Sequence, residues 1–110
     1  MKLIDRNELQ HTLERVTLVE ALPEKYYRDV HLPGARHLPH DQVRELAPRV
    51  LPDRSAEIVV YCASSSCQNS HIAAKVLAQM GYTNVAVYAG GKQDWQEAGL
   101  PVEQVTSVAA

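Results

Sequence analysis

Two cysteines, Cys62 and Cys67, are the side chains in this chain best suited to chemistry, and they are the only two among its 110 residues. Both lie between the apolar run 58–61 and a predicted helix that Ser70 would cap. Exposed N–H groups and the dipole at a helix N-terminus stabilise a thiolate, which is the nucleophilic form of cysteine. The segment therefore predicts a reactive thiol at the entrance of a helix.

Composition restricts the classes of protein to consider. The chain is 45% hydrophobic and 22% charged with a net charge of −2, which is typical of one globular domain. We expect a single domain over 1–110, with its core at about 4–102 and a short tail at 103–110. Scattered basic residues argue against nucleic acid or a membrane as partner. The N-terminus lacks the apolar segment of a signal peptide, so we expect a cytoplasmic protein, in which paired thiols are more often catalytic than structural.

The order of predicted elements indicates an α/β fold. Strands are expected at 16–19, 36–38, 58–61 and 85–88. Helices are expected from Asp5, from Pro23 to about Arg28, from Asp41 to Ala47, from Ser70 to Gly81 and from Gly91 to Ala98. Such alternation predicts a mainly parallel sheet with helices on both faces. Sites in such sheets lie beyond the carboxyl ends of the strands, which is where Cys62 stands.

Four segments together resemble the rhodanese-like domain family of single-domain sulfurtransferases. They are Leu18-Val-Glu20, Val30-His-Leu-Pro-Gly-Ala35, Val59-Val-Tyr-Cys62, and the stretch from Gly81-Tyr82 through Gly90-Gly91 to Trp95. The resemblance implies a three-layer fold with a central five-stranded sheet. It also implies a cysteine persulfide that carries sulfane sulfur from a donor to a thiol or other nucleophilic acceptor. Donor and acceptor would be small molecules or proteins, and no metal or organic cofactor would be needed.

The loop departs from the pattern of the family it resembles. The family commonly places an arginine five residues after the cysteine, just before the serine that opens the helix. Counted from Cys62, that position is Cys67; counted back from Ser70, it is Asn69. Loop 62–69 contains neither Lys nor Arg, so it lacks a bidentate clamp for an anion. We therefore expect a persulfide substrate rather than free thiosulfate.

The two cysteines allow more than one assignment. Cys62, directly after the strand, is the favoured sulfur carrier. Cys67 is either the true nucleophile or the thiol that resolves a persulfide or disulfide on Cys62. The other residues expected to bind substrate share this segment: Ala63, Ser64, Ser65, Ser66, Gln68, Asn69, Ser70 and His71. No metal site is expected, and the sequence leaves the oligomeric state open.

Two other functions remain compatible with the sequence. One is a thiol–disulfide switch between Cys62 and Cys67, since four intervening residues allow the loop to close. The other is a rhodanese-like module that binds a protein partner without catalysis. Two further features need a structural explanation. Glu20 and Leu22 replace an Asp and an Arg common in the family, and Gly90 and Gly91 indicate a positive φ or a close approach to the loop.

Overall fold

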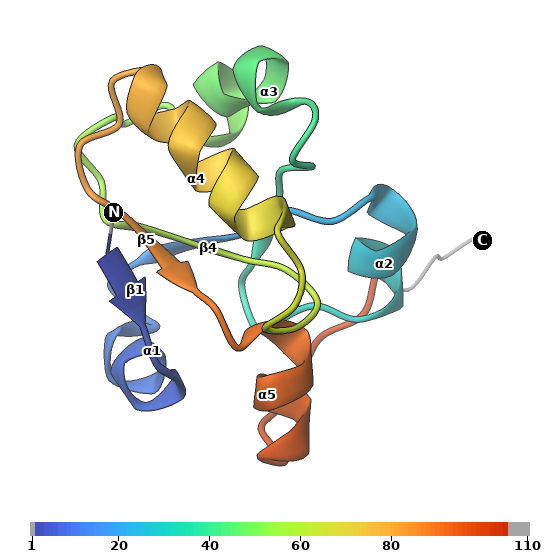
Figure 1. The fold of residues 1–110 in the computed structure, drawn as a ribbon. Coiled ribbons are helices and arrows are strands. Elements are labelled where there is room, and N and C mark those ends of the chain that lie inside the picture. The colour runs from blue at the N-terminus through green and yellow to red at the C-terminus, as the bar shows by residue number, and fades with distance from the viewer. Residues whose placement is uncertain (1, 106–110) are drawn as a thin grey trace.

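A computed structural model describes residues 2–105 as alternating strands and helices (Figure 1). The elements are β1 (Lys2–Ile4), α1 (Arg6–Thr12), β2 (Thr17–Glu20), α2 (Glu24–Asp29), β3 (Arg36–His37), α3 (Val43–Val50), β4 (Ile58–Tyr61), α4 (Asn69–Gln79), β5 (Val85–Tyr88) and α5 (Gly91–Glu97). In the order of the sheet, β1-β5-β4-β2-β3, every neighbouring pair is parallel. The predicted α/β class and five-stranded parallel sheet are confirmed.

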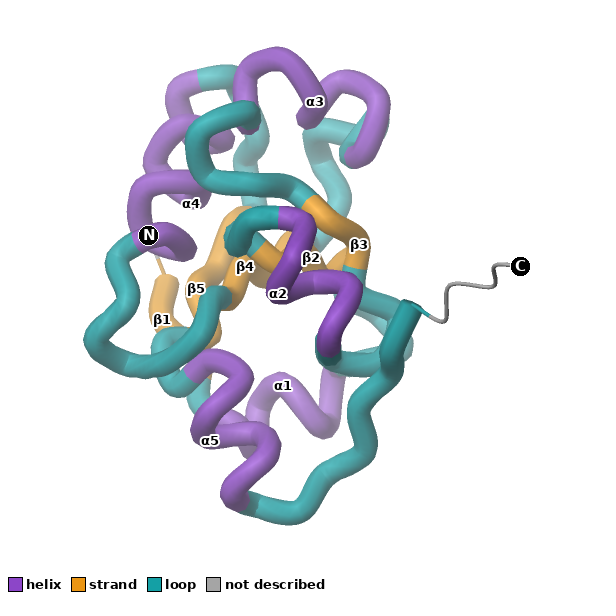
Figure 2. The backbone as a smooth tube through the Cα atoms, turned by 90° about the vertical axis from the view of Figure 1, so that its right-hand side faces the viewer, coloured by secondary structure: helices purple, strands orange, loops and turns teal. Residues whose placement is uncertain are grey.

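Alternation along β4 builds two cores, one on each face of the sheet. Ile58 and Val60 pack with the side chains of α3 and α4, whereas Val59 and Tyr61 pack with those of α1 and α5. All four are buried, as expected for a central strand covered on both faces. Figure 2 shows α3 and α4 on one side of the strands and α1 and α5 on the other. This is the expected three-layer arrangement.

Two elements differ from the sequence prediction. β1 was not predicted as a separate strand, because Ile4 is the one buried residue in its three and no alternation can be read from so short an edge strand. The helix predicted at 41–47 instead runs from Val43 to Val50, with Pro48 inside it. The Tyr82 hydroxyl donates to the carbonyls of Ala47 and Leu51, at 3.2 and 2.6 Å, and so satisfies acceptors at the end of the helix.

The start of α4 also differs from the prediction. The helix begins at Asn69 rather than after a Ser70 cap, and its N-cap residue Gln68 makes no capping hydrogen bond with its side chain. Ser70 instead lies buried in the first turn, where its hydroxyl has a partner described below. Along the helix, Ala73, Ala74 and Leu77 are fully buried, whereas Ile72 is 44% exposed.

The C-terminal end is more tightly attached than expected. Glu103 forms an antiparallel bridge with His31, and the Val105 amide donates to the Arg28 carbonyl at 3.1 Å. The tail expected from 103 therefore contacts the domain as far as 105, and its remainder, 106–110, lies outside the described residues.

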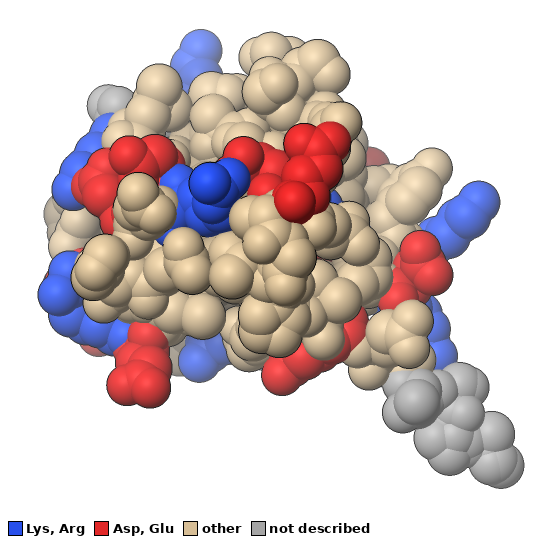
Figure 3. Space-filling model, turned by 90° about the horizontal axis from the view of Figure 1, so that it is seen from below, with Lys and Arg blue, Asp and Glu red and all other residues tan. Residues whose placement is uncertain are grey.

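The surface of the described part mixes charges of both signs. Seen from below, over α1 and α5, blue and red side chains are interspersed among uncharged ones (Figure 3). Arg6 and Asp94, which join these two helices, form an ion pair at 2.8 Å. Within residues 2–105, none of the helices has the length and apolar character needed to cross a membrane.

Candidate active site

Loop 62–68 joins the carboxyl end of β4 to the start of α4 and rests against the start of α5 (Figure 1). The N–H groups of Lys92 and Gln93 donate to the carbonyls of Cys62 and Ala63, each at 2.9 Å. Within the loop, the Cys67 N–H donates to the Ser64 carbonyl at 3.1 Å and closes a turn. Both ends of the loop are thus held by main-chain hydrogen bonds.

Gly91 allows α5 to come this close to the loop. Its φ is +66°, and a Cβ at this position would lie 2.6 Å from the Cys62 carbonyl oxygen and 2.9 Å from the Ser64 nitrogen. Only glycine combines a positive φ with such contact at little strain. The predicted role of Gly91 in a close approach to the loop is confirmed.

Cys62 lies inside the protein, beneath the loop. The residue is 1% exposed. Its single thiol proton has two acceptors within reach, the Ser70 hydroxyl at 3.3 Å and the Cys67 carbonyl at 3.4 Å. Burial raises the pKa of the Cys62 thiol, because a charged sulfur is poorly solvated there. At neutral pH Cys62 is therefore a protonated donor.

Cys67 lies nearer the surface and has the opposite electrostatic environment. Burial alone would raise the pKa of its thiol, but hydrogen bonds from the Cys62 thiol and from the N–H groups of Ala63 and Asn69 outweigh burial and lower it. These donors favour the charged form of the sulfur. The backbone N–H groups expected around a reactive thiol therefore gather more fully at Cys67 than at Cys62.

The remaining predicted residues fall into three groups. Ser70 contacts a sulfur directly, and its N–H also hydrogen-bonds to the Cys62 sulfur. Ser64 and Ser66 join their hydroxyls at 3.1 Å. The third group makes no side-chain hydrogen bond among the described residues and is exposed or partly exposed: Ala63, Ser65, Gln68, Asn69 and His71.

A buried ion pair supports the loop from below, and the sequence did not predict it. Lys92 is 7% exposed and Glu20 is fully buried; the Lys92 Nζ lies 3.0 Å from Glu20 Oε2 and donates to the Tyr26 carbonyl at 2.8 Å. Glu20 Oε1 accepts from the Tyr61 hydroxyl at 2.8 Å, and that hydroxyl in turn accepts from the Leu32 N–H at 3.0 Å. Lys92 thus supplies from α5 the cation that pairs with the buried Glu20.

The pKa of the Glu20 carboxyl in this pair is shifted upward. Burial raises the pKa of Glu20, and the contacts with Tyr61 and Lys92 oppose that shift. Because Glu20 and Lys92 are 72 positions apart, no local spacing could have revealed their pairing. The one available signal was Gly90-Gly91, which marked the start of α5 as a point of close approach.

An open cleft of about 520 Å³ borders the loop at Ala63. Its other walls come from α2 and α5 and the segments beside them: Leu22, Tyr26, Asp29, Val30, Lys92, Gln93, Gln96 and Glu97. The cleft offers apolar surface together with amide and carboxylate groups, next to the segment that holds the two sulfurs. Among residues 2–105, no group of three or more metal-ligating side chains is gathered closely enough to hold a metal ion.

Comparison with known proteins gives a consistent result. The model of the rhodanese-like domain matches residues 5–98. The thiosulfate sulfurtransferase PspE of Escherichia coli is 36% identical over 73 residues, which cover 66% of this chain and 66% of the relative. An HTH-type transcriptional regulator of Mycobacterium tuberculosis is 32% identical over 103 residues, 92% of this chain but 44% of the regulator. This chain thus spans less than two thirds of the length of either relative.

The fold is also found among solved structures. A crystal structure of a protein from Bacillus halodurans superimposes with a TM-score of 0.86 and covers 94% of this chain and 77% of that one, at 23% identity. At this identity the likeness concerns the fold alone.

Proposed function

The chain belongs to the rhodanese-like domain family, and from this premise we propose that it is a sulfurtransferase that carries sulfane sulfur as a persulfide on Cys67. The observation that supports this most strongly is the set of donors around the Cys67 sulfur, namely the Cys62 thiol and the N–H groups of Ala63 and Asn69. A thiolate held at a helix N-terminus is the attacking group that such chemistry needs.

The proposed reaction has two displacements at sulfur. In the first, the Cys67 thiolate attacks the sulfane sulfur of the donor, a new S–S bond forms, and the donor departs with the electron pair of the broken bond. In the second, an acceptor thiolate attacks the outer sulfur of the Cys67 persulfide, and Cys67 leaves as a thiolate again. The N–H groups of Ala63 and Asn69 stabilise the charge on Cys67 at the start and end of the cycle.

Exposure is the reason to assign the carrier role to Cys67. The sequence alone favoured Cys62, which follows the strand directly. With 1% of Cys62 exposed, a donor reaches its sulfur only if the loop opens, whereas Cys67 is partly exposed. An attacking thiol must be both accessible and charged at the working pH, and Cys67 meets both conditions better.

The electrostatics of the site support a persulfide donor. Loop 62–69 has no Lys or Arg, and the nearby cation of Lys92 is engaged by Glu20 at 3.0 Å. A small dianion such as thiosulfate would therefore meet backbone N–H groups but no free cation. We propose that a low-molecular-weight or protein persulfide is the better donor, with its non-reacting part resting in the cleft beside Ala63.

The test is a sulfur-transfer assay with a glutathione persulfide donor and a thiol acceptor. Cys67→Ser is expected to abolish transfer, whereas Ser66→Ala in the same loop should retain it. Cys62→Ser should also retain transfer to an external acceptor. Full activity of Cys67→Ser would contradict the assignment of the carrier, and the absence of transfer in wild-type protein would favour a binding module without catalysis.

A further inference from the structure

The loop places the Cys62 sulfur against Cys67. The Cys62 thiol lies 3.4 Å from the Cys67 carbonyl oxygen, and a hydrogen bond from Cys62 is among the causes that lower the pKa of the Cys67 thiol. Carrying sulfur on Cys67 uses Cys62 only as a hydrogen-bond donor, so the proposed function leaves the reactivity of this second, buried thiol unused. Its contact with Cys67 points to a reaction between the two.

We propose that Cys62 discharges the persulfide on Cys67, forming a Cys62–Cys67 disulfide and releasing hydrosulfide. This inference rests on the proposed function, since Cys67 must first receive sulfur. The Cys62 sulfur attacks the inner sulfur of the persulfide, which is the Cys67 Sγ itself. The chain would then reduce sulfane sulfur to sulfide when no acceptor thiol is present.

The step balances without an external oxidant. A Cys67 persulfide anion and a Cys62 thiol give a disulfide and hydrosulfide: the S–S bond to the outer sulfur breaks, the S–S bond between the cysteines forms, and the Cys62 proton moves to the departing sulfur. The two cysteine sulfurs are oxidised, and the outer sulfur takes up the two electrons. A dithiol, or two monothiols in succession, must then reduce the disulfide.

The surroundings of the pair favour this order of events. Cys62 keeps its proton in the resting protein because it is buried and donates to Ser70 at 3.3 Å, so it supplies that proton to the leaving sulfide. The turn closed between Ser64 and Cys67 folds the loop back over Cys62. Since only Cys67 is partly exposed, an incoming reductant would attack its sulfur and release Cys62.

The experiment loads reduced wild-type protein with one equivalent of glutathione persulfide under anaerobic conditions and at once removes the glutathione that the donor releases, so that no acceptor thiol remains. Wild-type protein is expected to release about one equivalent of sulfide per chain and to lose about 2 Da relative to the reduced form, as a disulfide requires. Cys62→Ser should instead keep a persulfide of about 32 Da and release no sulfide. A sample without donor controls for ordinary oxidation.

Two results would overturn the inference: wild-type protein that retains its persulfide as long as Cys62→Ser does, or Cys62→Ser that releases sulfide as fast as wild type. Cys62→Ala is measured in parallel, because a buried serine hydroxyl can disturb folding where a methyl group does not. Failure of the proposed function gives a different pattern, in which neither wild type nor Cys62→Ser gains sulfur at all.

Discussion

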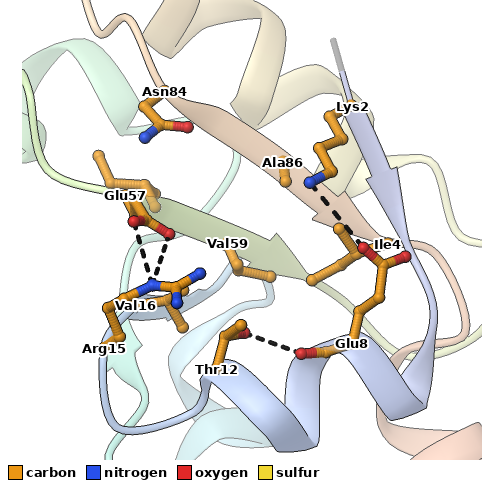
Figure 4. A pocket seen from close by; sticks show the side chains of 11 residues that line it. Lys2, Ile4, Glu8, Thr12, Arg15, Val16, Glu57, Val59, Asn84 and Ala86 are labelled. Atoms are coloured by element: carbon orange, nitrogen blue, oxygen red, sulfur yellow. Dashed lines mark hydrogen bonds and ion pairs between the residues drawn. The ribbon is translucent and has the colours of Figure 1, made fainter.

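The sheet has two rims, a carboxyl edge formed by the carboxyl ends of its strands and an amino edge formed by their amino ends. Polar side chains are buried at the first and exposed at the second. At the carboxyl edge, Glu20 and Lys92 are buried as a pair, and the two thiols share hydrogen bonds under the loop. At the amino edge, a small pocket of about 60 Å³ is rimmed by charged residues that remain in solvent (Figure 4). There Arg15 pairs with Glu57 at 3.1 Å, with side chains that are 64% and 39% exposed.

The difference shows which polar groups mark a site. Exposed ion pairs such as Arg15–Glu57 contribute little to stability, because water and salt screen them. A buried pair is retained only with full compensation, and Lys92 of the pair at the carboxyl edge also donates its N–H to the Cys62 carbonyl at 2.9 Å. The buried charges are therefore tied to the loop that carries the thiols.

The largest expected effect comes from breaking the buried pair. Lys92→Met leaves the Glu20 carboxyl buried without its cation and is expected to lower the free energy of unfolding by about 3–5 kcal/mol. The matched change at the other edge, Arg15→Met, should stay within about 1 kcal/mol. Urea denaturation of both variants measures the contrast, and equal losses would contradict the difference between the edges.

The same variant has a defined pH dependence. Burial already raises the pKa of Glu20, and removal of Lys92 raises it further. A carboxyl with a raised folded pKa contributes stability that is fully present below its unfolded pKa of about 4.3 and is lost as pH rises through the folded pKa. The loss of unfolding free energy that Lys92→Met causes should therefore grow from pH 4 to pH 7. A loss that becomes smaller over this range would exclude Glu20 as its cause.

The next largest loss of stability is expected from adding a methyl group at Gly91. In the control Gly99→Ala, the new Cβ would have nothing within 4 Å, so its main cost is that alanine must adopt the positive φ of +73°. That conformation costs about 1–2 kcal/mol. Gly91→Ala adds a clash with the Cys62 carbonyl at 2.6 Å, so it should destabilise more and also impair sulfur transfer. Thermal unfolding and the transfer assay compare the two variants. Unimpaired transfer in Gly91→Ala would show that the close contact between α5 and the loop is not needed for activity.

The smallest effect concerns the ionisation of the two thiols. Cys67 should react with iodoacetamide first, with a midpoint below the thiol value of about 8.5, because its hydrogen bonds lower its pKa. Cys62→Ala removes the S–H donor without supplying another and should move that midpoint upward. Site-resolved alkylation against pH measures both, and faster labelling of Cys62 in folded protein would reverse the proposed roles.

Much of this arrangement could be predicted from local sequence. The apolar runs at 58–61 and 85–88 predicted the central strands, and the place of Cys62 after the first run predicted the loop. Contacts made by distant residues could not be predicted. Tyr82 reaches the carbonyls at the end of α3 from a position more than 30 residues further along the chain, and the pairing of Lys92 with Glu20 exists only once the sheet has formed. The roles of the two thiols likewise depend on burial, which spacing does not report.

The most direct test of the central claim is to locate the first sulfur that the protein receives. Wild-type protein is mixed with glutathione persulfide, quenched in acid at short times with a thiol-blocking reagent, and analysed by fragment mass spectrometry that separates Cys62 from Cys67. The earliest additional sulfur is expected on Cys67, before any disulfide or sulfide is detected. A first sulfur on Cys62, with Cys67 still a free thiol, would contradict the assignment.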